Sequence, residues 1–203
     1  MKNTWFISDT HFAHANIIHF SNRPFAGIEA HDETLIENWN RAVAPSDEVY
    51  FLGDFVFKSK DGAVGIRRQL NGSQIFFIEG NHDSAARQIR GTFAWYDDVK
   101  MVEVNGQKIW LSHYAHRVWP HSHHGAWHLY GHSHHSLPDD PNSLSFDVGV
   151  DATAVRLGRP EFYGTGTIPM EGLRPEDYRP IHFDEVLELM NKKTFRPVDH
   201  HGA

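Results

Sequence analysis

Five short segments of this chain carry carboxylate, imidazole and amide side chains of the kinds that bind metal ions. In chain order they are Asp9-Thr10-His11, Gly53-Asp54, Gly80-Asn81-His82-Asp83, Ser112-His113 and Gly131-His132-Ser133-His134. The chain has no cysteine, so any metal ion must be bound through oxygen and nitrogen atoms. Two dications held side by side by such groups activate water for hydrolysis. The segments therefore predict a hydrolytic metal centre.

Each segment taken alone also has an ordinary structural explanation. Asp54 could cap the end of a strand, and Asn81 or Asp83 could cap a helix after a glycine turn. A single histidine usually lies on the surface or is hydrogen-bonded in the core. The balance changes when the five segments are considered together, because open α/β sheets bind ligands at the carboxyl ends of their strands. A shared site is therefore the better interpretation.

The elements that must position these segments can be read from the hydrophobic pattern. Short apolar runs alternate with helical patterns, which is typical of an α/β fold. Leu35, Trp39 and Val43 recur every four residues and predict a helix, and Asn105-Gly106 between two alternating runs predicts a hairpin. We expect strands at residues 5–8, 49–52, 74–79, 128–130 and 144–150, a hairpin at residues 99–113, and helices at residues 31–43, 62–70, 83–90 and 183–190.

Length and composition describe one globular domain. The chain has 203 residues, 40% of them hydrophobic and 22% charged, and no stretch is apolar enough to span a bilayer. The formal net charge of -7 disfavours binding to duplex nucleic acid, because proteins that grip phosphate backbones carry a basic face. The first residues lack a signal-peptide pattern, which predicts a cytoplasmic protein. We expect residues 1–203 to form a single domain.

Two parts of the chain are harder to place. Residues 152–178 are rich in Gly, Pro and Arg, and we expect an insertion or a flap there. The last residues, including His200-His201, are expected to form a disordered tail. A flap near the metal centre would influence the choice of substrate.

The five segments resemble the motifs of the calcineurin-like metallophosphoesterase family: D-x-H, GD, GNH followed by an acidic residue, a lone His, and GH-x-H. All five occur here in order, from residue 9 to residue 134. The resemblance implies a four-layer α/β/β/α sandwich with mixed sheets and a two-metal site at one edge. Small stand-alone bacterial and phage phosphoesterases of the family also carry something like Asn22-Arg23-Pro24-Phe25 and Gly149-Val150-Asp151.

The resemblance also implies a role for each residue. Asp9, His11 and His134 would hold one metal ion, Asn81, His113 and His132 would hold the other, and Asp54 would bridge both. His82 would be a catalytic residue that does not bind metal. Asp83 has two interpretations that we leave open: it orients His82, or it is the N-cap of the following helix.

The implied chemistry is hydrolysis of a phosphate ester. Two dications about 4 Å apart polarise the phosphoryl oxygens and lower the pKa of a bridging water, so the nucleophile would be metal-bound hydroxide. His82 could protonate the leaving alkoxide or stabilise the transition state. Manganese is the first expectation for the metal, while iron, zinc, cobalt and nickel also suit mixed imidazole and oxygen ligands. Magnesium alone suits them less well.

Substrate contacts are expected from two regions outside these motifs. Asn16 or Arg23 could contact a phosphate group, although a surface arginine is the usual alternative. His116, Trp119 and His123 could form an aromatic and imidazole wall that stacks on a base. Packing of Trp119 under a loop explains its presence equally well.

The principal functional prediction is hydrolysis of a small phosphodiester, such as a nucleotide or cyclic nucleotide. A phosphomonoesterase or a pyrophosphohydrolase with the same centre is the nearest alternative, and a nuclease is less favoured by the acidic balance. A metal-holding binding scaffold is the alternative from another class. His82 is present, which argues against the scaffold. The expected partner is a small phosphate ester, with no membrane and no duplex nucleic acid, and the oligomeric state is left open.

Overall fold

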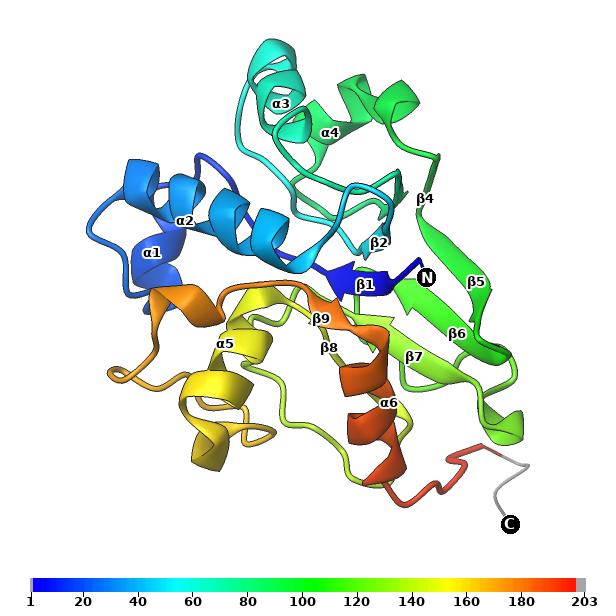
Figure 1. Cartoon of the computed structure of the whole chain (residues 1–203). Helices are drawn as coiled ribbons and strands as arrows, with labels where there is room; N and C mark the ends of the chain where they lie inside the picture. Colours follow the sequence, from blue (N-terminus) through cyan, green and yellow to red (C-terminus); the bar gives the residue numbers. More distant parts are fainter. Residues whose placement is uncertain (1, 200–203) are drawn as a thin grey trace.

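Two β-sheets that share a core form the centre of the computed structural model, which describes residues 2–199 (Figure 1). The first sheet has the order β4 (Trp95–Asp97), β3 (Gln74–Ile78), β2 (Glu48–Phe51), β1 (Thr4–Ile7) and β9 (Ile181–His182). The second has the order β5 (Val99–Val104), β6 (Gln107–Ser112), β7 (Trp127–Tyr130) and β8 (Ser145–Asp147). In the first sheet, β1 to β4 are parallel and β9 is antiparallel to β1. In the second sheet, β5 and β6 form an antiparallel hairpin, β7 pairs in parallel with β6, and β8 pairs in parallel with β7. Both sheets are therefore mixed.

Side-chain alternation buries both faces of the first sheet. Along β2 and just beyond it, Val49 and Phe51 lie in one core, whereas Tyr50 and Leu52 lie in a second core. The second core lies between the sheets, because it also contains Ile109 and other residues of β6 and β7. A parallel sheet that is covered on both faces is apolar at nearly every strand position. This is why its strands read as continuous apolar runs.

Helices α2 (Ile28–Ala42), α3 (Lys60–Arg67), α4 (Ser84–Gln88) and α5 (Val150–Gly158) cover the outer face of the first sheet, since each adds side chains to the core that contains Val49. Helix α6 (Phe183–Asn191) adds to the core between the sheets. Helix α1 (Ile17–Phe20) is a single turn. Further 3₁₀ turns lie at Arg90–Thr92, Ser122–His124, Pro160–Phe162 and Pro175–Asp177. Over residues 2–199, no helix is long and apolar enough to cross a membrane.

A loop, residues 113–126, covers the outer face of the second sheet. Alternation in β6 and β7 turns Trp110 and His128 away from the core between the sheets. Trp119 packs on His128 with ring centroids 5.2 Å apart, and the indole Nε1 of Trp110 donates a hydrogen bond to Nδ1 of His116 at 2.9 Å. The predicted α/β fold with two mixed sheets is confirmed, and this loop forms its outer cover.

Most predicted elements lie within three residues of their observed bounds, but the strand predicted at residues 144–150 is wrong at its end. Strand β8 ends at Asp147, and α5 begins at Val150. Residues 150–155 are all buried, although Asp151 and Thr153 are polar, and the pattern of so short a buried segment does not distinguish a helix from a strand. The Asp147 carboxylate accepts a hydrogen bond from the Gly149 amide at 2.7 Å and closes the turn between them.

Much of the segment at residues 152–178 belongs to the core on the outer face of the first sheet. Helix α5, Leu173 and Tyr178 all contribute to this core, which also contains Val49. The surface part returns toward the loop after α1, where the Asn22 amide contacts the Met170 sulfur at 3.1 Å. An insertion or a flap at residues 152–178 stays a prediction. His200-His201 lie outside the described residues.

Candidate metal centre

The five segments meet at one edge of the sandwich, where they follow β1, β2, β3, β6 and β7. The loops after β1 and β2 are joined through their backbones, because the Asp9 amide donates to the Gly53 carbonyl at 2.9 Å and the His11 amide donates to the Asp54 carbonyl at 3.0 Å. Parallel strands end at the same edge of a sheet, so residues distant in sequence converge there. The predicted convergence is thus present in the structure.

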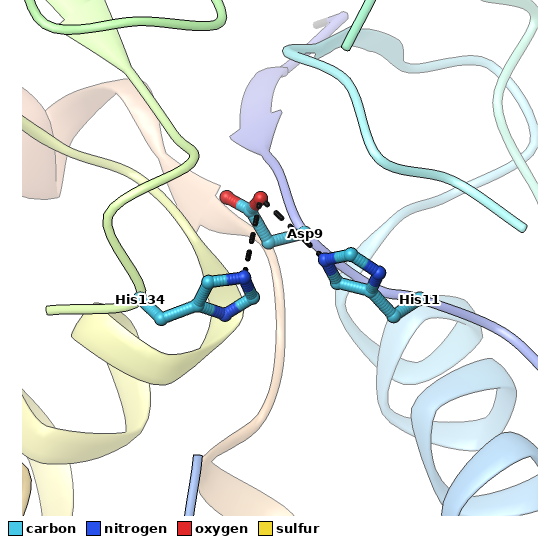
Figure 2. Close-up of side chains that lie close together, drawn as sticks. All are labelled: Asp9, His11 and His134. Carbon is cyan, nitrogen blue, oxygen red and sulfur yellow. Dashed lines mark ion pairs between the residues drawn. The ribbon is translucent and has the colours of Figure 1, made fainter. Parts of the chain in front are cut away.

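The first ligand group consists of Asp9, His11 and His134 (Figure 2). Nε2 of His11 and Nε2 of His134 each lie 3.9 Å from the same oxygen, Oδ1 of Asp9. Oδ1 of Asp9 and both ring nitrogens of His11 are buried and have no hydrogen-bond partner among residues 2–199. Buried polar atoms without partners are costly. Their convergence fits a cation that would complete their bonding.

The second ligand group consists of Asn81, His113 and His132. Oδ1 of Asn81 lies 3.0 Å from Nε2 of His113 and 3.0 Å from Nδ1 of His132. Nδ1 of His113 bonds to the Leu52 carbonyl at 2.7 Å, so that nitrogen carries the proton in the neutral ring and Nε2 is left as the ligand atom. The three donor atoms therefore face a common point.

Asp54 lies between the two ligand groups. Its Oδ2 atom is 3.4 Å from Nε2 of His11 and 3.5 Å from Nε2 of His113, and it forms a possible metal site with His113 and His132. The other oxygen, Oδ1, accepts a hydrogen bond from the His82 amide at 2.9 Å. This orientation directs a single carboxylate oxygen toward both groups, as a bridging ligand requires.

The backbone at the ligands adopts a conformation that side-chain-bearing residues seldom take. The φ angles are positive at five ligands: Asp9 (59°), His11 (49°), Asp54 (59°), His132 (66°) and His134 (45°). Each such conformation costs on the order of 1 kcal/mol and persists only where the surroundings hold it. Backbone strain of this kind clusters at functional sites, and here it turns the side chains toward one another.

Two glycines allow the ligand loops to approach. A Cβ atom at Gly80 would meet the Asp54 backbone and carboxylate, and one at Gly131 would meet Ser8 and the Asp9 carboxylate. Glycine at these positions lets the loops pack closely around the carboxylates. The GNHD and GH-x-H segments therefore need their glycines for packing.

The carboxylates set the protonation of the imidazoles. Burial raises the pKa of Asp9 to about 6. Burial acts in the same sense on Asp54, but the hydrogen bond and charge of His113 lower its pKa to about 2. Burial would lower the pKa of His113 and of His134, yet hydrogen bonds to neighbouring carboxylates raise each to about 9. The field that retains these protons also attracts dications, which compete with protons for the ring nitrogens.

Asp151 holds His134 and was not among the predicted site residues. Oδ2 of Asp151 accepts a hydrogen bond from Nδ1 of His134 at 2.7 Å, which leaves Nε2 facing Asp9 (Figure 2). Burial raises the pKa of Asp151, but the nearby Arg23 guanidinium and His134 lower it well below its usual range. The sequence signal was the Gly149-Val150-Asp151 segment, to which no role had been assigned.

Arg23 is buried, and its predicted phosphate contact is wrong. The guanidinium bonds to both carboxylate oxygens of Asp151 at 2.9 and 2.7 Å. It also donates to the carbonyls of Asp9 at 2.7 Å and Thr10 at 3.0 Å, and its side chain has no exposed area. Arg23 therefore connects the strained Asp9 loop to the residue that holds His134.

Asp83 is the N-cap residue of α4, as one of its two predicted interpretations has it, but its carboxylate bonds elsewhere. Its carboxylate accepts hydrogen bonds from the backbone amides of Asp54, Phe55 and Gly80 at 2.8, 2.8 and 2.7 Å. It occupies the N-cap position of α4 without capping the helix through its side chain, and these bonds do not orient the His82 ring. Asp83 instead fastens the GD loop to the GNHD loop. Burial raises its pKa to about 6.

His82 lies at the surface of a cleft of about 470 Å³ beside the metal centre. Its ring centroid is 5.7 Å from that of His11 and 5.0 Å from that of Phe57. The catalytic role of His82 stays a prediction. The cleft is lined by His11, His14, Ile17, Phe20, Ser21, Phe57, His82, His132, Ser133, His134, Ser136 and Ile168.

The other predicted substrate residues do not line this cleft. Asn16 is exposed at the start of α1, and His123 lies in the 3₁₀ turn at Ser122–His124. Trp119 is buried and donates to the Ala126 carbonyl at 2.9 Å, so the packing alternative holds and the stacking role is wrong. His116 is engaged with Trp110 and His128 on the outer face of the second sheet. Composition alone could not show which aromatic residues reach the centre.

Comparison with known proteins assigns the chain to a family. Residues 3–163 match the calcineurin-like phosphoesterase superfamily domain. An uncharacterized protein of Methanocaldococcus jannaschii is 33% identical over 207 residues, covering 98% of this chain and 98% of that protein. The gene 66 protein of Mycobacterium phage L5 is 36% identical over 86 residues, which is 41% of each chain. A solved structure, a protein of unknown function from Aquifex aeolicus, shares the fold with a TM-score of 0.63 and 23% identity, covering 93% of this chain and 100% of that one. The chain therefore belongs to the calcineurin-like phosphoesterase superfamily, a family of metal-dependent phosphoester hydrolases.

Proposed function

We propose that this protein is a binuclear metal-dependent phosphodiesterase that acts on small substrates. The observation that carries the proposal is the position of Oδ2 of Asp54, within 3.4 Å of His11 in the first ligand group and 3.5 Å of His113 in the second. A carboxylate oxygen shared by two ligand groups suits a pair of dications. The first group would hold one ion, the second group the other, and Asp54 both.

The chemistry of the donor atoms fits the proposed ions. When bound, two dications polarise the phosphoryl oxygens and lower the pKa of water. Mixed imidazole, carboxylate and amide donors suit manganese, which we propose as the first choice, and also iron, zinc, cobalt and nickel. The unpartnered buried atoms of Asp9 and His11 support a resident ion in the first group.

His82 is the residue we propose for proton transfer. Its ring lies in the cleft near the first ligand group and is not part of either group. Its backbone is fixed by the hydrogen bond to Oδ1 of Asp54, so the ring projects from the same loop that supplies Asn81. A protonated imidazole there donates a proton to the leaving alkoxide, and the neutral ring that results is reprotonated by solvent.

The lining of the cleft favours a diester over a monoester. Among residues 2–199, no Lys or Arg lines this cleft, and the guanidinium of Arg23 is buried against Asp151. A monoester near neutral pH carries up to two negative charges, which proteins usually bind with arginine or lysine. A diester carries one negative charge and two organic substituents. Metal ions and imidazoles are sufficient for the single charge.

The proposal is tested by hydrolysis assays with purified protein after removal and replacement of metal. Bis-p-nitrophenyl phosphate, p-nitrophenyl phosphate and cyclic nucleotides are compared at equal concentrations with Mn²⁺ and with the other candidate ions. We expect diester turnover at least about tenfold above monoester turnover. Faster monoester turnover would reject the diesterase assignment. Absence of turnover with every ion, despite bound metal, would favour the binding scaffold.

A further inference from the structure

We infer that the cleft beside the metal centre binds a flat aromatic ring carried by the substrate, so that the substrates are phosphate esters of nucleosides or of other aromatic alcohols. The inference rests on the proposed function and names the class of substrate for the same site. It is carried by three aromatic side chains, His14, Phe20 and Phe57, which we call the aromatic platform. All three line the cleft together with the metal ligands.

The aromatic platform is a continuous set of rings. The His14 and Phe57 rings are stacked with centroids 4.1 Å apart and an interplanar angle of 9°. The Phe20 ring meets His14 edge-on at 6.2 Å. Phe20 is 71% exposed and Phe57 is 38% exposed, so both have apolar area available to a ligand. Exposed aromatic faces next to a polar centre are typical of sites that stack on a ring.

The aromatic platform continues directly into the metal centre. The His11 ring lies 5.5 Å from His14 and 5.8 Å from Phe57. A ring stacked on the aromatic platform therefore lies next to His11, a metal ligand. A phosphate that is joined to that ring through a sugar or through a single oxygen then lies near the metal centre. His82, 5.0 Å from Phe57, borders both parts.

Packing of the protein does not explain the exposure of Phe20. In helix α1, Ile17 is the buried residue, and Phe20 belongs to neither hydrophobic core. A second apolar contribution comes from the far part of the chain, where Ile168 lines the same cleft. The Asn22 contact with Met170 holds this segment near the loop that follows α1. Two segments distant in sequence thus add apolar surface to one cleft.

The test uses binding and does not depend on turnover. Metal-loaded protein is titrated by calorimetry with AMP, ribose 5-phosphate and phenyl phosphate. AMP and ribose 5-phosphate share the phosphate and the sugar and differ by the base. We expect AMP to bind at least about tenfold more tightly than ribose 5-phosphate, since stacking on an aromatic side chain is worth about that much. Phenyl phosphate binding as tightly as AMP points to any flat ring, and weaker binding points to a nucleobase.

Variants connect the preference to the aromatic platform. Phe20→Ala and Phe20→Leu should reduce the ratio of AMP to ribose 5-phosphate affinity several-fold at unchanged metal content, because leucine keeps apolar volume without a flat face. The control is Phe195→Ala, since Phe195 is another exposed phenylalanine, at 38%, and does not line the cleft. Equal affinity for AMP and ribose 5-phosphate would overturn the inference even if diesters are hydrolysed. Failure to bind any phosphate, with no turnover, would instead reject the proposed function.

Discussion

The two ligand groups differ in how completely protein surrounds them. In the first group, Asp9 and His11 are buried and His134 has 20% of its side chain exposed. In the second group, His113 is buried, but Asn81 and His132 are exposed. Further contacts hold the first group in place, because His134 is hydrogen-bonded to Asp151 and Asp151 forms an ion pair with Arg23.

This difference indicates that the two metal sites differ in how tightly they bind their ions. Ligands that are buried and held by further hydrogen bonds are positioned before the ion arrives, so the first group should bind its ion more tightly. Exposed ligands leave room for water and substrate, so the second group should exchange its ion more readily. The shared residue, Asp54, makes the two sites interdependent.

Replacement of Asp54 should have the largest effect. Asp54→Ala removes the oxygen that faces both ligand groups, and we expect a loss of about a thousandfold or more in kcat/KM together with loss of metal from both sites. Metal content by mass spectrometry and diester assays measure this. The matched control is Asp61→Ala, which alters an exposed carboxylate on α3. A fully active Asp54→Ala protein would reject the bridging role.

Replacement of His82 should slow chemistry without removing metal from either site. His82 lies in the cleft and outside both ligand groups, so His82→Ala should lower kcat by about a hundredfold or more through loss of proton transfer. The effect should be smaller for bis-p-nitrophenyl phosphate than for an alkyl diester, because a nitrophenolate leaves without a proton. Loss of metal in this variant would show that His82 is a ligand.

Replacement of Asp151 should weaken metal binding by the first ligand group only. Asp151→Asn keeps the shape of the side chain but removes the charge between His134 and Arg23. We expect the affinity of the first site to fall by about tenfold to a hundredfold, as found for residues that hold metal ligands, with the second site little changed. Metal titration of the variant checks this.

The control for Asp151→Asn is Asp184→Asn, an exposed residue of α6 that is 79% exposed. Circular dichroism and thermal unfolding should first show that the Asp151 variant is folded, because a buried guanidinium that loses its partner is destabilising by about 3 kcal/mol or more. If a folded Asp151→Asn protein binds metal equally weakly at both sites, Asp151 does not act on the first ligand group alone.

The sequence predicted that the metal ligands lie close together, but it did not predict which residues hold those ligands in place. Asp9, Asp54 and His113 follow apolar strands, and strand order brings such positions together. Arg23 and Asp151 were not recognised as a pair, because they lie 128 positions apart and arginine is usually exposed. The pattern around Asp83 indicates a role within its own loop and helix, whereas two of the three bonds of its carboxylate go to a loop 28 and 29 positions away.

The cleft was also beyond the reach of sequence patterns. The cluster from His116 to His124 suggested a ligand-binding wall by composition, but it covers the outer face of the second sheet. Phe20, Phe57 and Ile168 come from three separate segments and share one cleft. Only the packing of the loops shows which aromatic residues reach the metal centre.

The smallest expected effect concerns protons, and it compares the two groups directly. In metal-free protein the pKa of His113 and of His134 is raised to about 9 from 6.5, so each contributes stability that is complete below pH 6.5 and lost as pH rises toward 9. The lowered pKa of Asp54, about 2, gives stability above pH 3.8 that is lost as pH falls toward 2. The Tm of metal-free protein should therefore decline between pH 6.5 and 9.

Binding of Mn²⁺ at pH 7 should release these protons, because metal ions bind neutral imidazole. Calorimetry in two buffers with different heats of ionisation gives the number released, and we expect about two, one from each ligand group. In His134→Ala only His113 of the second group retains its proton, so the release should fall by about half. Unchanged release in that variant, or a Tm that does not vary with pH in metal-free protein, would show that the carboxylates do not hold protons on these two imidazoles.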